Sequence, residues 1–327
     1  MDGQMQLSDR IGRRMKLHDL HVLMAVVQAG NMTRAARLLN TTQPAISRSI
    51  ADLEQTVGVR LLDRSRNGVE PTEYGRALLN GGTAMFDDLR QAVKHIESLV
   101  DPTVGEVRVG THDPMIVGLL PAVFDKLHRT HPGISVHVTQ APTNAQQFHG
   151  LRERRIDLLL GRMTLPIDDD IDVQLLFHDR AVVVAGPKSR WAHRSKVEMS
   201  ELSVGPWCLP LPDTTIGTVV ADAFRACGVA FPPKGVLWGG ATLMAALIPR
   251  GPYLGVFPAS LLHFGANLPK LKVVPVELPI PPWSVGAMML KNRTLTPAVQ
   301  VFIDYAREIV KPLAGKKQRP AGTRGKS

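Results

Sequence analysis

Residues 35–75 have the sequence AARLLNTTQPAISRSIADLEQTVGVRLLDRSRNGVEPTEYG. In its middle, apolar residues recur at helical spacing from Ile46 to Leu53, and Gly58 follows as a residue suited to the end of a helix. Two short apolar stretches then flank the polar tip 63–68, a pattern typical of a small β-hairpin. This part of the chain therefore predicts a helix followed by a hairpin of two strands.

Two further helices are predicted before this one. Residues 17–29 carry apolar side chains at helical spacing, and residues 32–40 do so after Asn31, a residue type favoured at helix starts. Three short helices followed by a hairpin form a winged helix-turn-helix. We expect this domain at residues 17–75, after a flexible tail at residues 1–16.

The third helix carries side chains that suit DNA. It is expected to begin near Thr42 with its apolar stripe directed inward, which leaves Gln43, Ser47 and Arg48 on the opposite side. Glutamine and arginine can bond base edges or phosphates, and a short serine permits close approach to the DNA backbone. For any single one of these residues a solvated helix face is the better interpretation. Together, in the second helix of a helix-turn-helix and next to a wing, they favour DNA contact.

The whole stretch from Ala35 to Gly75 resembles the signature of LysR-type transcription regulators. The shared features are an alanine pair, a Gln-Pro-Ala-x-Ser-Arg start of the recognition helix, a Leu-Glu pair and a Gly-Val-x-Leu-x-x-Arg wing, in this order. The resemblance implies a recognition helix in the major groove and a wing along the backbone or minor groove. The DNA-binding residues that it indicates are Thr33, Thr42, Gln43, Pro44, Ser47, Arg48, Arg64, Arg66 and Asn67.

A long helix is predicted from Thr72 onward, with residues 76–100 as a linker. One seam of a heptad repeat is formed by Leu78, Met85, Ala92 and Leu99, and the other by Gly82, Leu89 and Ile96. Such a repeat favours a partner helix, and therefore a homodimer or homotetramer, although a helix packed on its own domain would give a similar pattern. Residues 101–106 are expected to form a hinge.

Beyond the hinge, apolar strands such as Ile156–Leu160 alternate with helices, which predicts a parallel sheet with helical crossovers. The resemblance implies an effector domain like a periplasmic binding protein, with two α/β halves and a cleft between them. We place this domain at residues 107–311, so the fold class of the whole chain is α+β. The first half is assigned to residues 107–178 and 284–311, and the second to residues 179–283. A basic disordered tail is expected at residues 312–327.

Effector ligands bind at carboxyl ends of strands and at helix N-termini in open α/β sheets. Such places are held by Thr111, His112, Asp113, Thr143, Arg162, Thr214, Thr215 and Thr242. Arg162 suits a carboxylate ligand or a structural salt bridge. Asp113 repels acids and accepts bonds from hydroxyl groups or an amine, or else it is a helix cap without a ligand. The expected effector is a sugar, a sugar acid or another small organic acid.

Composition limits the remaining classes of function. The 39 Lys and Arg against 29 Asp and Glu give a net charge of +10, which fits double-stranded DNA, although six of these bases lie in the last 17 residues. Two cysteines without zinc-site spacing predict no metal site and no cofactor. The absence of a signal peptide and of a long apolar run predicts a cytoplasmic protein without a membrane segment.

Two other classes of protein fit the sequence less well. An exported solute-binding protein would need a signal peptide and would not carry a winged helix-turn-helix. An enzyme with a DNA-binding appendage would need a catalytic motif, and no catalytic residue is identified. The resemblance to LysR-type regulators therefore implies a protein that binds an interrupted palindromic operator, responds to a small-molecule effector and contacts RNA polymerase.

Overall fold

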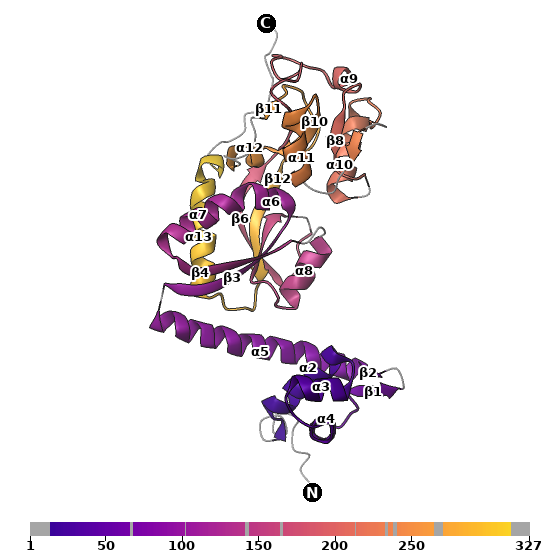
Figure 1. Cartoon of the computed structure of the whole chain (residues 1–327), viewed down its shortest axis with the longest axis vertical. Helices are drawn as coiled ribbons and strands as arrows, with labels where there is room; N and C mark the ends of the chain where they lie inside the picture. Colours follow the sequence, from indigo (N-terminus) through magenta and orange to yellow (C-terminus); the bar gives the residue numbers. More distant parts are fainter. Residues whose placement is uncertain are drawn as a thin grey trace. The chain divides into compact units, whose positions relative to one another are not determined.

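The computed structural model divides the chain into two compact units, residues 1–92 and residues 93–327 (Figure 1). The residues that it describes are 14–65, 68–101, 103–140, 144–163, 166–212, 214–232, 235–237, 241–264 and 271–314. Most of the two predicted tails, at residues 1–13 and 315–327, lies outside the described residues, as do the predicted site residues Arg66, Asn67 and Thr143.

The first unit contains three helices and a two-stranded hairpin, followed by the start of a long helix. The elements are α2 (Leu17–Ala29), α3 (Met32–Leu38), α4 (Gln43–Val57), β1 (Leu62–Ser65), β2 (Gly68–Pro71) and α5 (Glu73–Val100). The strands pair from Leu62 with Pro71 to Ser65 with Gly68, so they extend into what was predicted as the polar tip. Helix α3 ends at Leu38, before the predicted residue 40, and Asn40 takes a left-handed φ of 49°.

Small and branched apolar side chains fill the core of this unit. Leu23, Val26 and Ile50 are fully buried, and Ala35 at 0 % exposure lets α3 approach its neighbours closely. The start of α5 packs on the same core, where a Cβ on Gly82 would lie 2.9 Å from a methyl carbon of Leu20. Gly82 thus serves close helix packing rather than a free heptad seam.

The first sheet of the second unit is mixed. Its strand order is β4 (Gly133–Gln140), β3 (Val104–Thr111), β5 (Leu158–Arg162), β12 (Trp283–Leu290) and β6 (Ile171–Asp179). Strands β4, β3 and β5 are parallel, but β12 runs antiparallel to both β5 and β6. The predicted parallel sheet is therefore confirmed for β4, β3 and β5 but is wrong for β12 and β6, because the chain leaves this sheet through β6 and returns beside it through β12.

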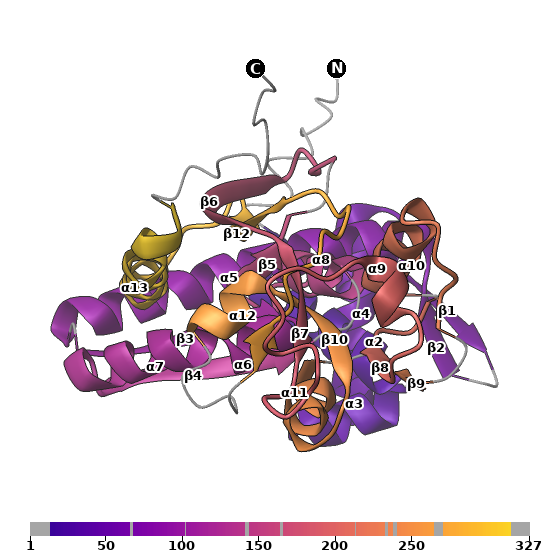
Figure 2. The same ribbon diagram turned by 90° about the horizontal axis from the view of Figure 1, so that it is seen from above.

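Helices cover both faces of this first sheet (Figure 2). They are α6 (Asp113–Val117), α7 (Leu119–Thr130), α8 (Asn144–Arg152) and α13 (Pro297–Ala314). Helices α7 and α13 bury one face with residues such as Val123 and Phe302, whereas α8 buries the other with Leu151. Helix α13 continues to Ala314, past the predicted start of the tail at residue 312. Helix α6 follows β3 directly and lies at the carboxyl end of that strand.

The second sheet has the strand order β11 (Lys272–Val273), β7 (Ala181–Ala185), β10 (Leu254–Pro258), β8 (Trp207–Leu209) and β9 (Gly235–Leu237). The helical elements around it are α9 (Met199–Leu202), α10 (Thr215–Ala226), α11 (Ala241–Leu247), η1 (Ile248–Arg250) and α12 (Ala259–Phe264). Asp179 pairs with Trp283 where the chain passes between the two sheets, one residue beyond the predicted boundaries at 178 and 284.

The predicted hinge at residues 101–106 is shorter in the structure. Val104 already begins β3 and pairs with Gly133 of β4, so only residues 101–103 separate α5 from the sheet.

Candidate DNA-binding and effector sites

The recognition helix α4 separates an apolar from a polar side as predicted. Ile46 and Ile50 are buried in the core, whereas Gln43 and Arg48 are exposed. Ser47 is half-buried, so it lies at the border between the two sides. The exposed side of the first half of the helix therefore carries one amide and one guanidinium group, both of which are able to bond the edges of DNA bases.

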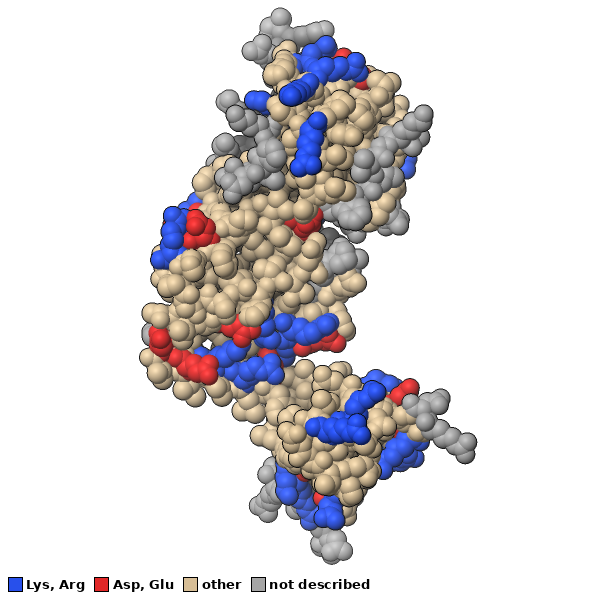
Figure 3. All heavy atoms as spheres, in the orientation of Figure 1, with Lys and Arg blue, Asp and Glu red and all other residues tan. Residues whose placement is uncertain are grey.

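The other predicted DNA residues occupy three places. The Thr42 hydroxyl accepts a hydrogen bond from the Ala45 amide at 3.4 Å and caps α4, and Pro44 is exposed in the first turn. Thr33 is exposed at the start of α3, and Arg64 is exposed on β1. Lys and Arg side chains are spread over the visible surface of this unit, with few acidic side chains between them (Figure 3).

The Leu-Glu pair of the recognition helix has a structural role that the sequence alone did not reveal. Leu53 is buried in the core, and the Glu54 carboxylate accepts hydrogen bonds from the amides of Leu61 at 2.7 Å and Leu62 at 3.2 Å. These two amides begin the wing, so Glu54 ties the wing to the recognition helix. The other wing strand is held by the Val69 amide, which donates to the carbonyl of Gly30 at 3.0 Å.

In the second unit, Asp113 joins the two halves. Its carboxylate accepts from the amide of Thr242 at 2.8 Å and from the hydroxyl of Thr242 at 2.7 Å. Asp113 belongs to α6 beside the first sheet, and Thr242 to the first turn of α11 beside the second sheet. The alternative that Asp113 caps its own helix is wrong, because His112 holds that position and Asp113 caps α11 across the junction instead.

Arg162, the last residue of β5, carries an unsatisfied group. Its Nε is the one buried side-chain nitrogen or oxygen in the described part of the chain without a hydrogen-bond partner. The guanidinium lies over the ring of Trp283, 5.0 Å from its centroid, and burial lowers the pKa of Arg162. No ion pair of Arg162 is found among the described residues, which removes the support for the alternative of a structural salt bridge.

His112 lies close enough to both of these charged residues for their charges to act on its ring. Its ring packs on Gly161, where a Cβ would come within 2.4 Å of Cε1, so only glycine leaves room for the imidazole. Burial lowers the pKa of His112 to about 4, with the charge of Asp113 acting against this shift and the charge of Arg162 adding to it. The ring is therefore neutral near pH 7 and offers one hydrogen-bond donor and one acceptor.

The remaining predicted effector residues within the described ranges are threonines. The hydroxyls of two of them form hydrogen bonds that stabilise the fold, and the side chain of the third is not described. Thr111 is fully buried, and its hydroxyl donates to the carbonyl of Leu160 at 2.7 Å, which joins β3 to β5. Thr214 caps α10 by accepting from the Gly217 amide at 3.1 Å. Thr215 begins α10, but its side chain is outside the described set. The structure thus brings together His112, Asp113, Arg162 and Thr242, whereas Thr111 and Thr214 are structural.

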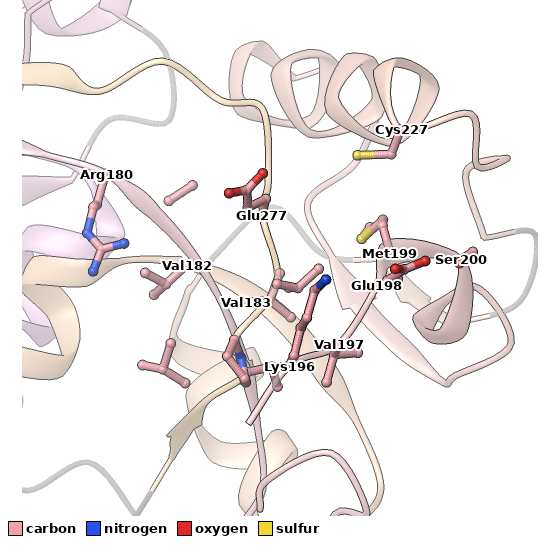
Figure 4. Close-up of a pocket in the computed structure, with 15 residues that line it drawn as sticks. Arg180, Val182, Val183, Lys196, Val197, Glu198, Met199, Ser200, Cys227 and Glu277 are labelled. Atoms are coloured by element: carbon pink, nitrogen blue, oxygen red, sulfur yellow. The ribbon is translucent and has the colours of Figure 1, made fainter. Parts of the chain in front are cut away.

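A cavity of about 650 Å³ lies in the second half (Figure 4). Its charged lining residues Arg180, Lys196, Glu198 and Glu277 are all exposed, and none of the predicted effector residues lines it. The unsatisfied buried group of the described chain lies instead at Arg162. We therefore take the cluster around Arg162 as the candidate effector site.

A winged helix-turn-helix followed by a two-sheet α/β domain defines a DNA-binding regulator with an effector-binding domain. Family comparison agrees with this class. Residues 17–76 match the bacterial regulatory helix-turn-helix of the lysR family, and residues 101–311 match the LysR substrate binding domain. The chain belongs to the LysR family of transcription regulators, which are not enzymes. No helix in the described ranges is long and apolar enough to cross a membrane.

Individual relatives cover nearly the whole chain. The chain is 26% identical over 296 residues to the regulator GbpR of Azospirillum brasilense, which covers 90% of this chain and 86% of GbpR. It is 29% identical over 311 residues to the probable regulator LrrA of Synechococcus elongatus, covering 90% and 97% of the two chains.

Solved structures share the fold at lower identity. Full-length CbnR bound to its target DNA has a TM-score of 0.60 at 22% identity, covering 90% of this chain and 99% of that one. A full-length OxyR variant from Pseudomonas aeruginosa has a TM-score of 0.63 at 18% identity, covering 93% of this chain and 99% of that one.

Proposed function

We propose that this regulator is controlled by a small effector with a carboxylate group, which binds to Arg162 at the junction of the two halves. The observation that carries the proposal is the buried Nε of Arg162, which lacks a hydrogen-bond partner. An unmade hydrogen bond of a buried charged group costs roughly 1–3 kcal/mol or more. A carboxylate that accepts from this N–H and from a terminal N–H would recover that free energy through a charge-assisted, bidentate pair.

The location of this group couples binding to domain geometry. Arg162 ends β5 in the first half, and its guanidinium lies over Trp283, the residue through which the chain re-enters that sheet. Asp113, whose charge acts on His112 as that of Arg162 does, is bonded to α11 of the second half. A ligand at Arg162 therefore binds next to the contact that joins the halves, and differential binding to two arrangements of the halves would shift their populations.

DNA binding would use the exposed face of α4 and the wing. Gln43 and Arg48 would enter the major groove, and Arg64, Arg66 and Asn67 would follow the backbone or minor groove. The related fold of CbnR was crystallised with its target DNA, which supports this mode of binding. The operator would be an interrupted palindrome, bound in the cytoplasm, where the regulator would also contact RNA polymerase.

The exposed face of α5 supports a homodimer, or a homotetramer formed by two dimers. Met85, Leu89, Ile96 and Leu99 expose 37%, 46%, 60% and 70% of their surface in the single chain. Large apolar side chains in a heptad seam are expected to pack against a second helix. A two-fold dimer would also present two recognition helices to the two halves of a palindrome.

The proposal is tested by a thermal-shift screen of small carboxylates, sugar acids and neutral sugars with the parent chain and two variants. Arg162→Ala removes the proposed ligand group, and Arg180→Ala is the matched control, an exposed arginine in the same unit. An effector at a hundred times its dissociation constant should stabilise the parent and the control by roughly 2.7 kcal/mol, but not Arg162→Ala. Equal stabilisation of Arg162→Ala, or hits restricted to neutral sugars, would contradict the proposal.

A further inference from the structure

We propose that Asp113 makes the effector site selective for ligands with a single carboxylate, because this residue itself contributes a negative charge to the site. The inference rests on the proposed function, since it concerns the same site at Arg162. It extends the proposed function by stating how many carboxylates the ligand carries and which kind of polar group accompanies them.

The hydrogen-bond donors of Thr242 on the second half are already occupied by Asp113. The Asp113 carboxylate places one oxygen 2.8 Å from the amide of Thr242 and the other 2.7 Å from its hydroxyl. A ligand carboxylate that reached from Arg162 towards α11 would need these same donors. They are already used by a carboxylate of the protein, so a second ligand carboxylate would find like charge and no free donor there.

Asp113 and Arg162 both lie close enough to His112 to affect it. Asp113 follows His112 in the chain, and the ring of His112 packs on Gly161, the residue before Arg162. The charges of Asp113 and Arg162 both act on the pKa of His112, in opposite directions. Asp113 and Arg162 are therefore both close enough to the neutral imidazole for their charges to act on it, and we expect a ligand bound to Arg162 to experience the charge of the aspartate.

The charges of the site limit the number of carboxylates that a bound ligand can carry. Arg162 carries one positive charge and Asp113 one negative charge, and His112 is neutral near pH 7 because burial lowers its pKa to about 4. A single ligand carboxylate pairs with Arg162. A second that reached towards α11 would face Asp113 without a counter-ion, and like charges at close range repel. We expect this repulsion to weaken binding of a diacid by roughly 10- to 100-fold relative to a monoacid of the same shape.

Asp113 and His112 retain the capacity to form further hydrogen bonds with a ligand. A carboxylate offers about four acceptor sites, and Thr242 uses two of those on Asp113. A ligand hydroxyl or ammonium group can use the others, and the neutral ring of His112 can bond the same group. The structure thus points to a monocarboxylate that carries a hydroxyl or amino group, such as a hydroxy acid or an aldonic acid.

The experiment compares diacids with ligands of matched shape that carry one negative charge. The pairs are succinate with succinamate, phthalate with phthalamate, and glucarate with gluconate. Each ligand is titrated into the full-length parent, Asp113→Asn and Arg162→Ala, with stabilisation followed by thermal shift. Asp172→Asn, an exposed acid on β6 away from the cluster, is the matched control for loss of one negative charge.

For at least one pair, the parent and Asp172→Asn should bind the monoanion roughly 10- to 100-fold more tightly than the diacid. Asp113→Asn keeps the side-chain shape and one oxygen acceptor but removes the charge, so this preference should fall to within about threefold. Thr242→Val removes a hydrogen bond to Asp113 but leaves the charge, and it should keep the preference for the monoanion. This outcome separates charge selection from a merely structural contact between the halves.

The inference is overturned if the parent prefers the diacid of every pair, if no monoanion binds, or if Asp113→Asn keeps the preference of the parent. Failure of the proposed function has a different signature. In that case Arg162→Ala binds the preferred ligand as tightly as the parent does, whatever the effect of Asp113→Asn.

Discussion

Replacing Glu54 with alanine removes the carboxylate that ties the wing to the recognition helix. The side chain is half-buried and accepts hydrogen bonds from the amides of Leu61 at 2.7 Å and Leu62 at 3.2 Å. Hydrogen bonds to charged groups contribute about 1.5–3 kcal/mol each, and the longer of these two lies at the weak end. Because water can reach part of this site, we expect Glu54→Ala to lower the free energy of unfolding of the first unit by about 2–3 kcal/mol.

A change of this size is measurable. It should lower the midpoint of thermal unfolding of a unit of this length by on the order of 10 °C, followed by circular dichroism. Operator affinity should fall several-fold in fluorescence anisotropy even below the transition, because the wing loses its fixed position. Glu54→Gln keeps an acceptor oxygen and should lose less than half as much stability. If Glu54→Ala unfolds at the temperature of the parent, the two hydrogen bonds do not hold the wing.

Three further predictions concern other parts of the chain. Arg48→Ala should weaken operator binding by about 1–3 kcal/mol without changing the unfolding midpoint, and unchanged affinity in a gel-shift titration would remove Arg48 from the recognition face. Leu89→Asp should place a charge in the α5 seam and dissociate the proposed dimer, which light scattering detects; an unchanged mass would exclude this seam. Because burial lowers the pKa of His112 from 6.5 to about 4, the unfolded state takes up a proton first as the pH falls. Stability should therefore fall between pH 6.5 and 4, by up to about 1.4 kcal/mol per pH unit. Urea titrations should show a smaller decline for His112→Gln.

Local signals in the sequence were sufficient for much of the first unit. Helix α2 begins and ends at the predicted residues, because Gly30 takes the left-handed conformation that ends a helix, with φ at 66°. Gly58 does the same for α4, with φ at 82°. Each of these signals acts within a few residues of the element that it bounds, so it can be recognised without knowledge of the fold.

Long-range pairing could not be predicted in the same way. Strand β6 gains its place by pairing with β12, more than a hundred residues later, and its burial does not alternate regularly as in a strand with one buried face. A parallel sheet was predicted because strands and helices alternate along this part of the chain, whereas the antiparallel return of the chain through β12 leaves no local signal.

The candidate effector site shows the same limit. Asp113 and Arg162 were predicted from their places just after two predicted strands, which are local features. The partner of Asp113 is Thr242, 129 residues away, and the stacking of Trp283 on Arg162 depends on the register of β12 against β5. Residue type and position therefore identified which side chains to consider, but only the tertiary structure shows that Arg162 is left unpaired among the described residues.

The most direct test of the central claim is a footprint of the full-length protein on its own operator, with and without the carboxylate that best stabilises the parent. The parent should change its protected region or its affinity when the ligand is added, because the proposal has the ligand shift the arrangement of the two halves. Arg162→Ala should bind the same operator with the affinity of the unliganded parent and should not respond to the ligand. A full response by Arg162→Ala would contradict the assignment of Arg162 as the residue through which the effector controls DNA binding.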